Sequence, residues 1–205
     1  MDAGQFLGQS FPDSQADAYL LLKFDGDTAE DMAKASDGVA QICLEQGACD
    51  VLIADTDERA DAIWKTRGSF LQAINGSTTM MDEVDVVVPR NRVNEFVEFV
   101  HALQEEMHIR IKSFGHAGDG NLHVYILRDD LDEDEWHRVL EATMEKMYAK
   151  ARAMEGQVSG EHGIGFAKKP YLKESLDPAA VAVMQGIKKA FDPNNILNPH
   201  KVCFD

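Results

Sequence analysis

Residues 109–127 run Ile109-Arg-Ile-Lys-Ser-Phe-Gly-His-Ala-Gly-Asp-Gly-Asn-Leu-His-Val-Tyr-Ile-Leu127, and this stretch predicts two strands joined by a tight turn. The β-branched residues at its two ends favour strands over 109–113 and 122–127. The Gly-Asp-Gly-Asn segment between them is typical of a turn, because glycine and asparagine adopt positive φ at little cost. Such a hairpin would bring His116 and His123 close to one another.

Outward from this hairpin, helix and strand patterns alternate along the chain. Besides the hairpin, we expect strands at 18–24, 50–54 and 84–88. We expect helices at 29–46, 56–73, 92–106, 130–154 and 178–190. The order predicts an α+β fold with a largely antiparallel sheet covered by helices, in two halves that each could be ferredoxin-like. Residues 1–17 show little periodicity and predict an N-terminal lead-in segment, whereas 18–205 predict the domain itself.

Composition excludes several classes of protein. The 205 residues are 44% hydrophobic, as in an ordinary globular protein, and their net charge of -16 argues against binding a nucleic-acid backbone. The longest apolar runs have the length of a strand, so we expect no transmembrane segment. No secretion signal opens the sequence and the three cysteines form no C-x-x-C pair, so the expected location is cytoplasmic.

The histidines of the hairpin are candidate metal ligands. A second glycine-rich segment, Gly160-Glu-His-Gly163, adds a carboxylate and a third imidazole. Two neutral imidazoles and one carboxylate suit Zn²⁺, Mn²⁺ or Fe²⁺ and leave coordination positions open. We therefore expect His116, His123 and Glu161 to bind a divalent metal, with His162 beside it as a neutral proton acceptor.

Other side chains allow two interpretations each. Asp119 could be a further ligand, but its place between two turn glycines favours a structural role. Arg67 falls late in a predicted helix, where a solvated arginine is the simpler interpretation, although a guanidinium can also hold a substrate carboxylate. Lys168 and Lys169 are equally ambiguous. No phosphate loop, dinucleotide fingerprint or H-E-x-x-H helix is present, so nothing in the sequence would by itself hold a large redox cofactor.

Five segments, in the same order, resemble the C-terminal, substrate-side domain of FAD-linked oxidases of the vanillyl-alcohol-oxidase type. That group includes D-lactate dehydrogenase, the FAD subunit of glycolate oxidase and D-2-hydroxyglutarate dehydrogenase. The segments are Ile63-Trp-x-x-Arg67, Asp85-Val-Val-Val-Pro-Arg90, Phe114-Gly-His-Ala-Gly-Asp-Gly-Asn-Leu-His123, Gly160-Glu-His-Gly-Ile-Gly165 and Phe191-Asp-Pro-Asn-Asn-Ile-Leu-Asn-Pro199. They cover nearly the whole chain from about residue 18 onward.

The resemblance implies a role for each matching residue. It implies three ligands of a divalent metal: His116, His123 and Glu161. It further implies that His162 removes the proton of the 2-hydroxyl of a 2-hydroxy acid, that Arg67 holds the substrate carboxylate, and that Asn198 contacts the flavin side of the cleft. The product would be the 2-oxo acid. The FAD would be bound mainly by an N-terminal FAD-binding domain absent from this chain, so the chain alone is expected to be inactive.

The sequence departs from some relatives at positions that concern the substrate. Glu83 stands where some relatives have lysine, and Tyr125 where some have asparagine, so no particular hydroxy acid is predicted. Pro199 is followed by His200-Lys201, where Gly-Lys is frequent. Two alternatives remain open: a self-contained metalloenzyme with two histidines and one carboxylate, a hydrolase or an oxygenase, and a non-catalytic interaction module that keeps a vestigial site.

Overall fold

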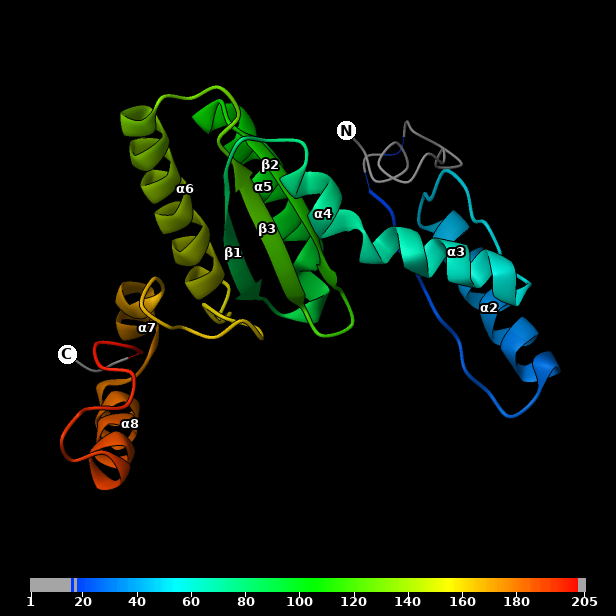
Figure 1. Ribbon diagram of the computed structural model, residues 1–205. Helices are drawn as coiled ribbons and strands as arrows, with labels where there is room; N and C mark the ends of the chain where they lie inside the picture. The colour runs from blue at the N-terminus through cyan, green and yellow to red at the C-terminus, as the bar shows by residue number, and fades with distance from the viewer. Residues whose placement is uncertain (1–15, 17, 203–205) are drawn as a thin grey trace. The chain divides into compact units, whose positions relative to one another are not determined.

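The computed structural model describes residues 16 and 18–202, which fall into two compact units with a boundary between Ala73 and Ile74 (Figure 1). The predicted lead-in segment, residues 1–17, lies outside the described residues except for Ala16. Among the described residues, no helix is both long enough and apolar enough to cross a membrane.

The first unit is helical. It contains α2 (Ala29–Glu45) and α3 (Asp57–Gly68), and α4 (Phe70–Asn75) runs across the boundary between the units. Thr28 and Thr56 begin α2 and α3, because each threonine hydroxyl accepts a hydrogen bond from the backbone N–H three residues later. The predicted helices in this part of the chain are confirmed, with the second interrupted at Ser69.

The two strands predicted for the first unit are wrong. Residues 18–24 and 50–54 have no regular structure, and their apolar side chains are exposed, with Leu20 at 65% and Leu52 at 62%. A strand needs a neighbouring strand to accept and donate its backbone hydrogen bonds, and the described residues of this unit supply none. These residues therefore form no ferredoxin-like half.

The second unit contains the sheet. Strands β1 (Met81–Val87), β2 (Arg110–His116) and β3 (Asn121–Leu127) pair antiparallel in the order β1-β3-β2. The α+β class and the antiparallel sheet are thus confirmed. With α5 (Val93–Met107) and α6 (Glu133–Ala153), the chain order β1-α5-β2-β3-α6 is the ferredoxin-like order up to its last strand. In place of that strand, a single antiparallel bridge joins Val87 to Gln157.

Three shorter helices complete this unit: the 3₁₀ helix η1 (Arg90–Arg92), α7 (Lys169–Ser175) and α8 (Pro178–Phe191). The helices predicted at 92–106, 130–154 and 178–190 are confirmed to within a few residues. The short α7 was not predicted, because its sequence Lys-Pro-Tyr-Leu-Lys-Glu-Ser has no helical pattern of apolar residues.

The two faces of the sheet differ in character, because alternate residues of a strand point to opposite sides. One face carries Val84, Val86, Val124 and Ile126, which form the hydrophobic core together with apolar side chains of α5 and α6. These two helices lie beside the sheet in Figure 1. The opposite face is polar. On that face, the register of β1 and β3 pairs Asp85 with His123 and Glu83 with Tyr125. Phe114 of β2, the other neighbour of β3, also pairs with His123.

The hairpin closes as its glycines require. β2 and β3 are joined by residues 117–120, and Gly120 has a φ of 76°. Gly120 lies so close to Val88 that a Cβ at this position would be 2.0 Å from the Val88 carbonyl oxygen. Only glycine fits there, because it lacks that atom and adopts positive φ freely.

Candidate active site and metal centre

The hairpin holds two histidines next to one another. His116 ends β2 and His123 lies near the start of β3, so the short turn between the strands brings their rings to a centroid distance of 5.6 Å, nearly perpendicular. His123 is buried, whereas nearly half of the His116 side chain is exposed. The expected proximity of these two residues is therefore present in the structure.

A loop after α6 supplies the carboxylate and the third imidazole. The Oε1 atom of Glu161 lies 3.2 Å from Nε2 of His123 and 3.6 Å from Nε2 of His116. Nε2 of His162 lies 4.0 Å from the same oxygen. Three imidazole nitrogens thus surround one carboxylate oxygen.

The donor set fits a divalent cation. His116, His123 and Glu161 each direct one ligand atom into a group whose atoms all lie within 4.8 Å of one another. Two imidazoles and a carboxylate are ligands that suit zinc, manganese and iron. Burial, reinforced by the neighbouring His162, lowers the pKa of His123, so this imidazole is neutral near pH 7, as a metal ligand must be. The half-exposed Glu161 and His116 leave a side open to solvent for a substrate.

The loop that carries Glu161 and His162 is fastened to a buried carboxylate of β1. Asp85 is fully buried, and its Oδ2 atom accepts hydrogen bonds from the backbone N–H groups of Gly160 at 3.0 Å, Glu161 at 3.2 Å and His162 at 3.0 Å. The same oxygen accepts a hydrogen bond from the Ser159 hydroxyl at 2.9 Å. One carboxylate oxygen therefore fixes the backbone of both a proposed ligand and the proposed base.

The contacts of Asp85 favour the ionised form of its carboxyl group. Burial alone would raise its pKa, but the hydrogen bonds from His162 and Ser159 and the charge of Lys168 hold the pKa at about 2. Nζ of Lys168, also buried, lies 3.4 Å from Oδ2. The structure thus gives Lys168 a place behind the loop, as the counter-ion of Asp85.

Close packing against the hairpin also fixes the loop. Gly160 lies against the side chain of Asn121, and a Cβ at Gly160 would come within 2.3 Å of the amide oxygen Oδ1. At the start of the loop, the N–H and C=O groups of Val87 and Gln157 bond to one another at 3.1 and 2.8 Å. The loop is therefore held against β1 at Gln157 and against Asn121 of β3 at Gly160.

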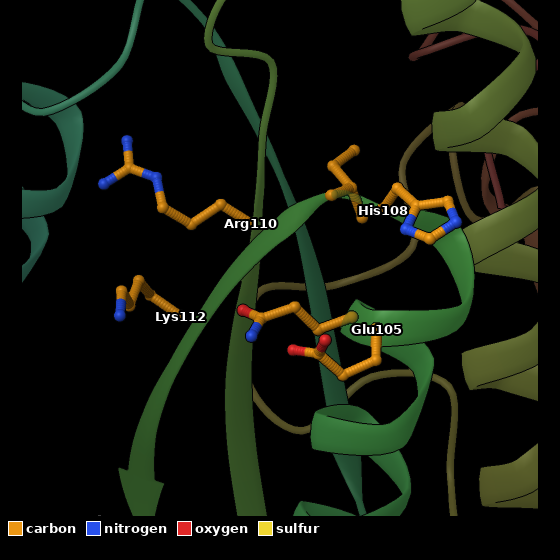
Figure 2. A pocket seen from close by; sticks show the side chains of 6 residues that line it. Glu105, His108, Arg110 and Lys112 are labelled. Carbon is orange, nitrogen blue, oxygen red and sulfur yellow. The ribbon is translucent and has the colours of Figure 1, made fainter.

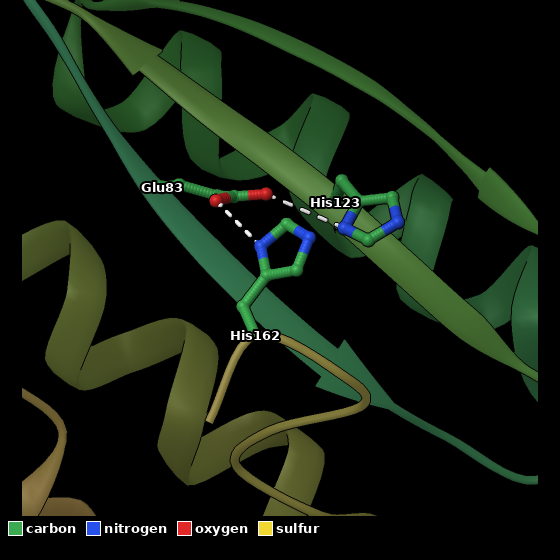
Figure 3. Close-up of side chains that lie close together, drawn as sticks. All are labelled: Glu83, His123 and His162. Carbon is green, nitrogen blue, oxygen red and sulfur yellow. Dashed lines mark hydrogen bonds and ion pairs between the residues drawn. The ribbon is translucent and has the colours of Figure 1, made fainter. Parts of the chain in front are cut away.

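The ring of His162 has a carboxylate partner of its own. Figure 3 shows the carboxylate of Glu83 directed at the rings of both His162 and His123. Nδ1 of His162 lies 2.8 Å from Oε2 of Glu83, and the hydroxyl of Tyr125 donates to Oε1 at 2.8 Å. The rings of His123 and His162 stack with a centroid distance of 4.7 Å. Glu83, His123 and His162 form a second group with metal-ligand spacing.

The remaining predicted site residues belong to other elements of the chain. Arg67 is near the end of α3, in the first unit, whereas the cluster belongs to the second. Asn198 follows α8 and lines a cavity of about 240 Å³ together with Phe191 and Leu197. Asp119 is exposed in the turn and belongs to neither ligand group found among the described residues. Within the second unit, the structure brings together His116, His123, Glu161 and His162.

A larger cavity, of about 390 Å³, lies away from the predicted residues (Figure 2). It is lined by Gln104, Glu105, His108, Ile109, Arg110 and Lys112. The guanidinium of Arg110 is already engaged, since it forms two hydrogen bonds with the carboxylate of Asp129. Size alone does not make this cavity the site.

The sequence-based predictions gave no role to Asp85 or Ser159, and they singled out Glu83 only as a departure from some relatives at a position that concerns the substrate. A signal for Asp85 was present, because a single carboxylate inside the run Val84-Asp-Val-Val-Val88 becomes a buried charge if the run is a strand. Glu83 follows from the same strand period, two residues earlier. Ser159 gave no signal, since its contact joins residues 74 positions apart.

Comparison with known proteins places this chain in a family. The family model described as "FAD linked oxidases, C-terminal domain" matches residues 2–202. A D-lactate dehydrogenase of Anaerostipes hadrus is 46% identical over 100% of this chain and 44% of its own length. The glycolate oxidase subunit GlcD of Bacillus subtilis is 37% identical over 92% of this chain and 40% of its own length.

A D-2-hydroxyglutarate dehydrogenase of Stutzerimonas stutzeri is 32% identical over 90% of this chain and 40% of its own length. The chain thus spans about two fifths of the length of these three relatives. Their names differ in the hydroxy acid and agree in the kind of substrate.

Proposed function

The chain belongs to the family of C-terminal domains of FAD-linked oxidases, and on that basis we propose that it is the substrate- and metal-binding part of an enzyme that oxidises a 2-hydroxy acid to the 2-oxo acid. The observation that carries this proposal is the convergence of three imidazole Nε2 atoms on Oε1 of Glu161. The partner that completes the enzyme is an FAD-binding domain outside these residues. The cytoplasmic location favoured by the sequence stays a prediction.

In this proposal the residues of the chain divide two tasks. His116, His123 and Glu161 hold a divalent metal, which when bound supplies positive charge that stabilises the alkoxide developing on the substrate, while FAD supplies the hydride acceptor. His162 takes the proton of the 2-hydroxyl at Nε2. Its Nδ1 is engaged by Glu83, so Nε2 is the nitrogen that remains for this proton.

The substrate carboxylate needs a cation. Arg67 is the residue that we propose for this role, since a guanidinium forms two parallel hydrogen bonds with a carboxylate. Asn198 is proposed to contact the flavin side of the cleft. Both proposals rest on the family resemblance.

The base assignment is tested by His162→Ala in this chain joined to an FAD-binding domain. We expect a loss of at least about 100-fold in the rate of flavin reduction by the hydroxy acid, because general-base catalysis contributes about 10²–10⁴-fold. FAD binding should be unchanged. His137→Ala is the matched control, because His137 is an exposed histidine on α6.

Flavin reduction by His162→Ala at the control rate would refute the base assignment. Turnover by this chain with metal alone, without FAD, would instead support the self-contained metalloenzyme.

A further inference from the structure

We propose that Glu83 is a positioning residue that sets the tautomers of His162 and His123. In each ring it favours the hydrogen on Nδ1, so that Nε2, the nitrogen on the side of Glu161, carries the lone pair. This inference rests on the proposed function, because it assigns Nε2 of His162 to the substrate proton and Nε2 of His123 to the metal.

The contact with His162 determines which nitrogen carries the hydrogen. An ionised carboxylate only accepts hydrogen bonds, so at 2.8 Å from Oε2 of Glu83 the Nδ1 atom of His162 must be the donor. A neutral imidazole with its hydrogen on Nδ1 has its lone pair on Nε2. Nε2 is the atom that lies 4.0 Å from Glu161.

Glu83 is itself held in place. It pairs directly with Tyr125 across β1 and β3, and the Tyr125 hydroxyl donates to Oε1 at 2.8 Å. About a quarter of the Glu83 side chain is exposed. A carboxylate bonded on one oxygen by a strand neighbour and on the other by His162 has little freedom to rotate, so it can orient the ring.

The buried His123 also faces the carboxylate of Glu83, although its Nδ1 forms no hydrogen bond with it. Its Nδ1 lies 3.3 Å from Oε1 of Glu83 and 3.8 Å from Oδ1 of Asp85. Oε1 of Glu161 lies 3.2 Å from Nε2 on the opposite side of the ring. With a metal between these two atoms, the carboxylates at Nδ1 favour a hydrogen on Nδ1 and leave the Nε2 lone pair for the metal. Carboxylate partners of this kind orient metal-binding histidines and raise their basicity.

The competing interpretation is a second metal held by Glu83 and the Nδ1 atoms of both histidines. Metal at these atoms would displace the hydrogen through which His162 bonds to Glu83. The hydroxyl of Tyr125, a hydrogen-bond donor, already occupies Oε1 of Glu83. The contacts therefore favour the positioning role.

The tautomers can be measured directly on this chain. Two-bond ¹H–¹⁵N spectra of the imidazoles should show His162 with hydrogen on Nδ1 in the absence of added metal, and His123 with hydrogen on Nδ1 once Zn²⁺ is bound. We expect Glu83→Ala to give a mixture of tautomers for His162, and Glu83→Gln to retain the Nδ1–H form because the amide oxygen still accepts. Asp82→Asn, an exposed carboxylate one residue away on β1, should leave both rings unchanged.

A pure Nε2–H form of His162 in the unsubstituted chain, or an unchanged spectrum in Glu83→Ala, would overturn the inference. Binding of two equivalents of Zn²⁺, the second of which is lost in Glu83→Ala, would overturn it in favour of a second metal site.

Flavin reduction in the assembly with the FAD-binding domain gives a second readout. Glu83→Ala should lower the rate at least about 10-fold and weaken Zn²⁺ binding about 10–100-fold, as loss of a carboxylate partner of a ligand does. Glu83→Gln should restore most of both. An inactive His162→Ala beside a fully active Glu83→Ala would refute the positioning role alone. An active His162→Ala would refute the base assignment, and the tautomer spectra would still test Glu83.

Discussion

At the scale of single residues, Asp85 determines where Glu161 and His162 lie. Its buried oxygen accepts four hydrogen bonds from residues 159–162 and lies close to Lys168. An uncharged replacement of Asp85 is poorly tolerated, because the four donors would face a weaker acceptor and Lys168 would lose its counter-ion.

We predict that Asp85→Asn lowers the free energy of unfolding by about 2–4 kcal/mol, because it leaves Lys168 as a buried charge without a counter-ion. Urea unfolding followed by circular dichroism measures this loss. The exposed Asp82→Asn on the same strand should change stability by less than about 0.5 kcal/mol. Equal stability of the two variants would contradict the anchoring role.

The pKa of Asp85 makes a separate prediction about pH. Because the pKa falls from 3.8 to about 2 on folding, the ionised form stabilises the folded state above pH 4, and this stabilisation is lost as the pH falls toward 2. The shift corresponds to about 2 kcal/mol. The free energies of unfolding of the unsubstituted chain and of Asp85→Asn should therefore differ most at pH 7 and approach one another as the pH is lowered through 4 to 2. A difference as large at pH 2 as at pH 7 would contradict this.

At the scale of elements, the site is a strand hairpin and one loop packed together. Gly160 permits this packing, since its α-carbon lies against the Asn121 side chain. The Asp85 hydrogen bonds then fix the backbone direction of the two residues that follow.

We predict that Gly160→Ala displaces this loop, because the added methyl carbon would overlap Oδ1 of Asn121. Zn²⁺ affinity, measured by calorimetry, should fall at least about 10-fold, as it does when groups that orient ligands are disturbed. Gly118→Ala is the matched control, since a Cβ there meets no atom within 4 Å. Unchanged affinity in Gly160→Ala would show that the loop adapts.

These elements also show what sequence could predict. The hairpin, its two histidines and the long helices depend on residues near in the chain, so local patterns identify them. The strands expected at 18–24 and 50–54 did not form, because strand formation depends on a partner that apolar pattern cannot specify. For the same reason, the contacts of Glu83 and Asp85 with the loop had to come from the structure, since they join residues 74 to 79 positions apart. The two departures from some relatives, Glu83 and Tyr125, prove to be hydrogen-bonded to one another.

At the scale of the whole molecule, the proposed metal centre and its supporting residues all belong to the second unit. The cluster of buried apolar residues that forms the hydrophobic core, from Val84 to Leu172, also lies within the second unit. We predict that a chain beginning at Gly76 folds cooperatively and binds Zn²⁺ with an affinity within about threefold of the full 205 residues, because no ligand is removed. Thermal unfolding and calorimetry test this. A noncooperative transition or loss of binding would mean that the first unit contributes to the centre.

In the proposed metal centre, His116, His123 and Glu161 bind the metal while His162 does not. Metal content, measured by mass spectrometry after loading with Zn²⁺ and dialysis, separates the two roles. We predict one equivalent in the unsubstituted chain and in His162→Ala, and less than about 0.1 equivalent in His116→Ala and Glu161→Gln, because loss of one of three protein ligands weakens a zinc site severely. Full metal content in His116→Ala and Glu161→Gln, or its loss in His162→Ala alone, would contradict the account.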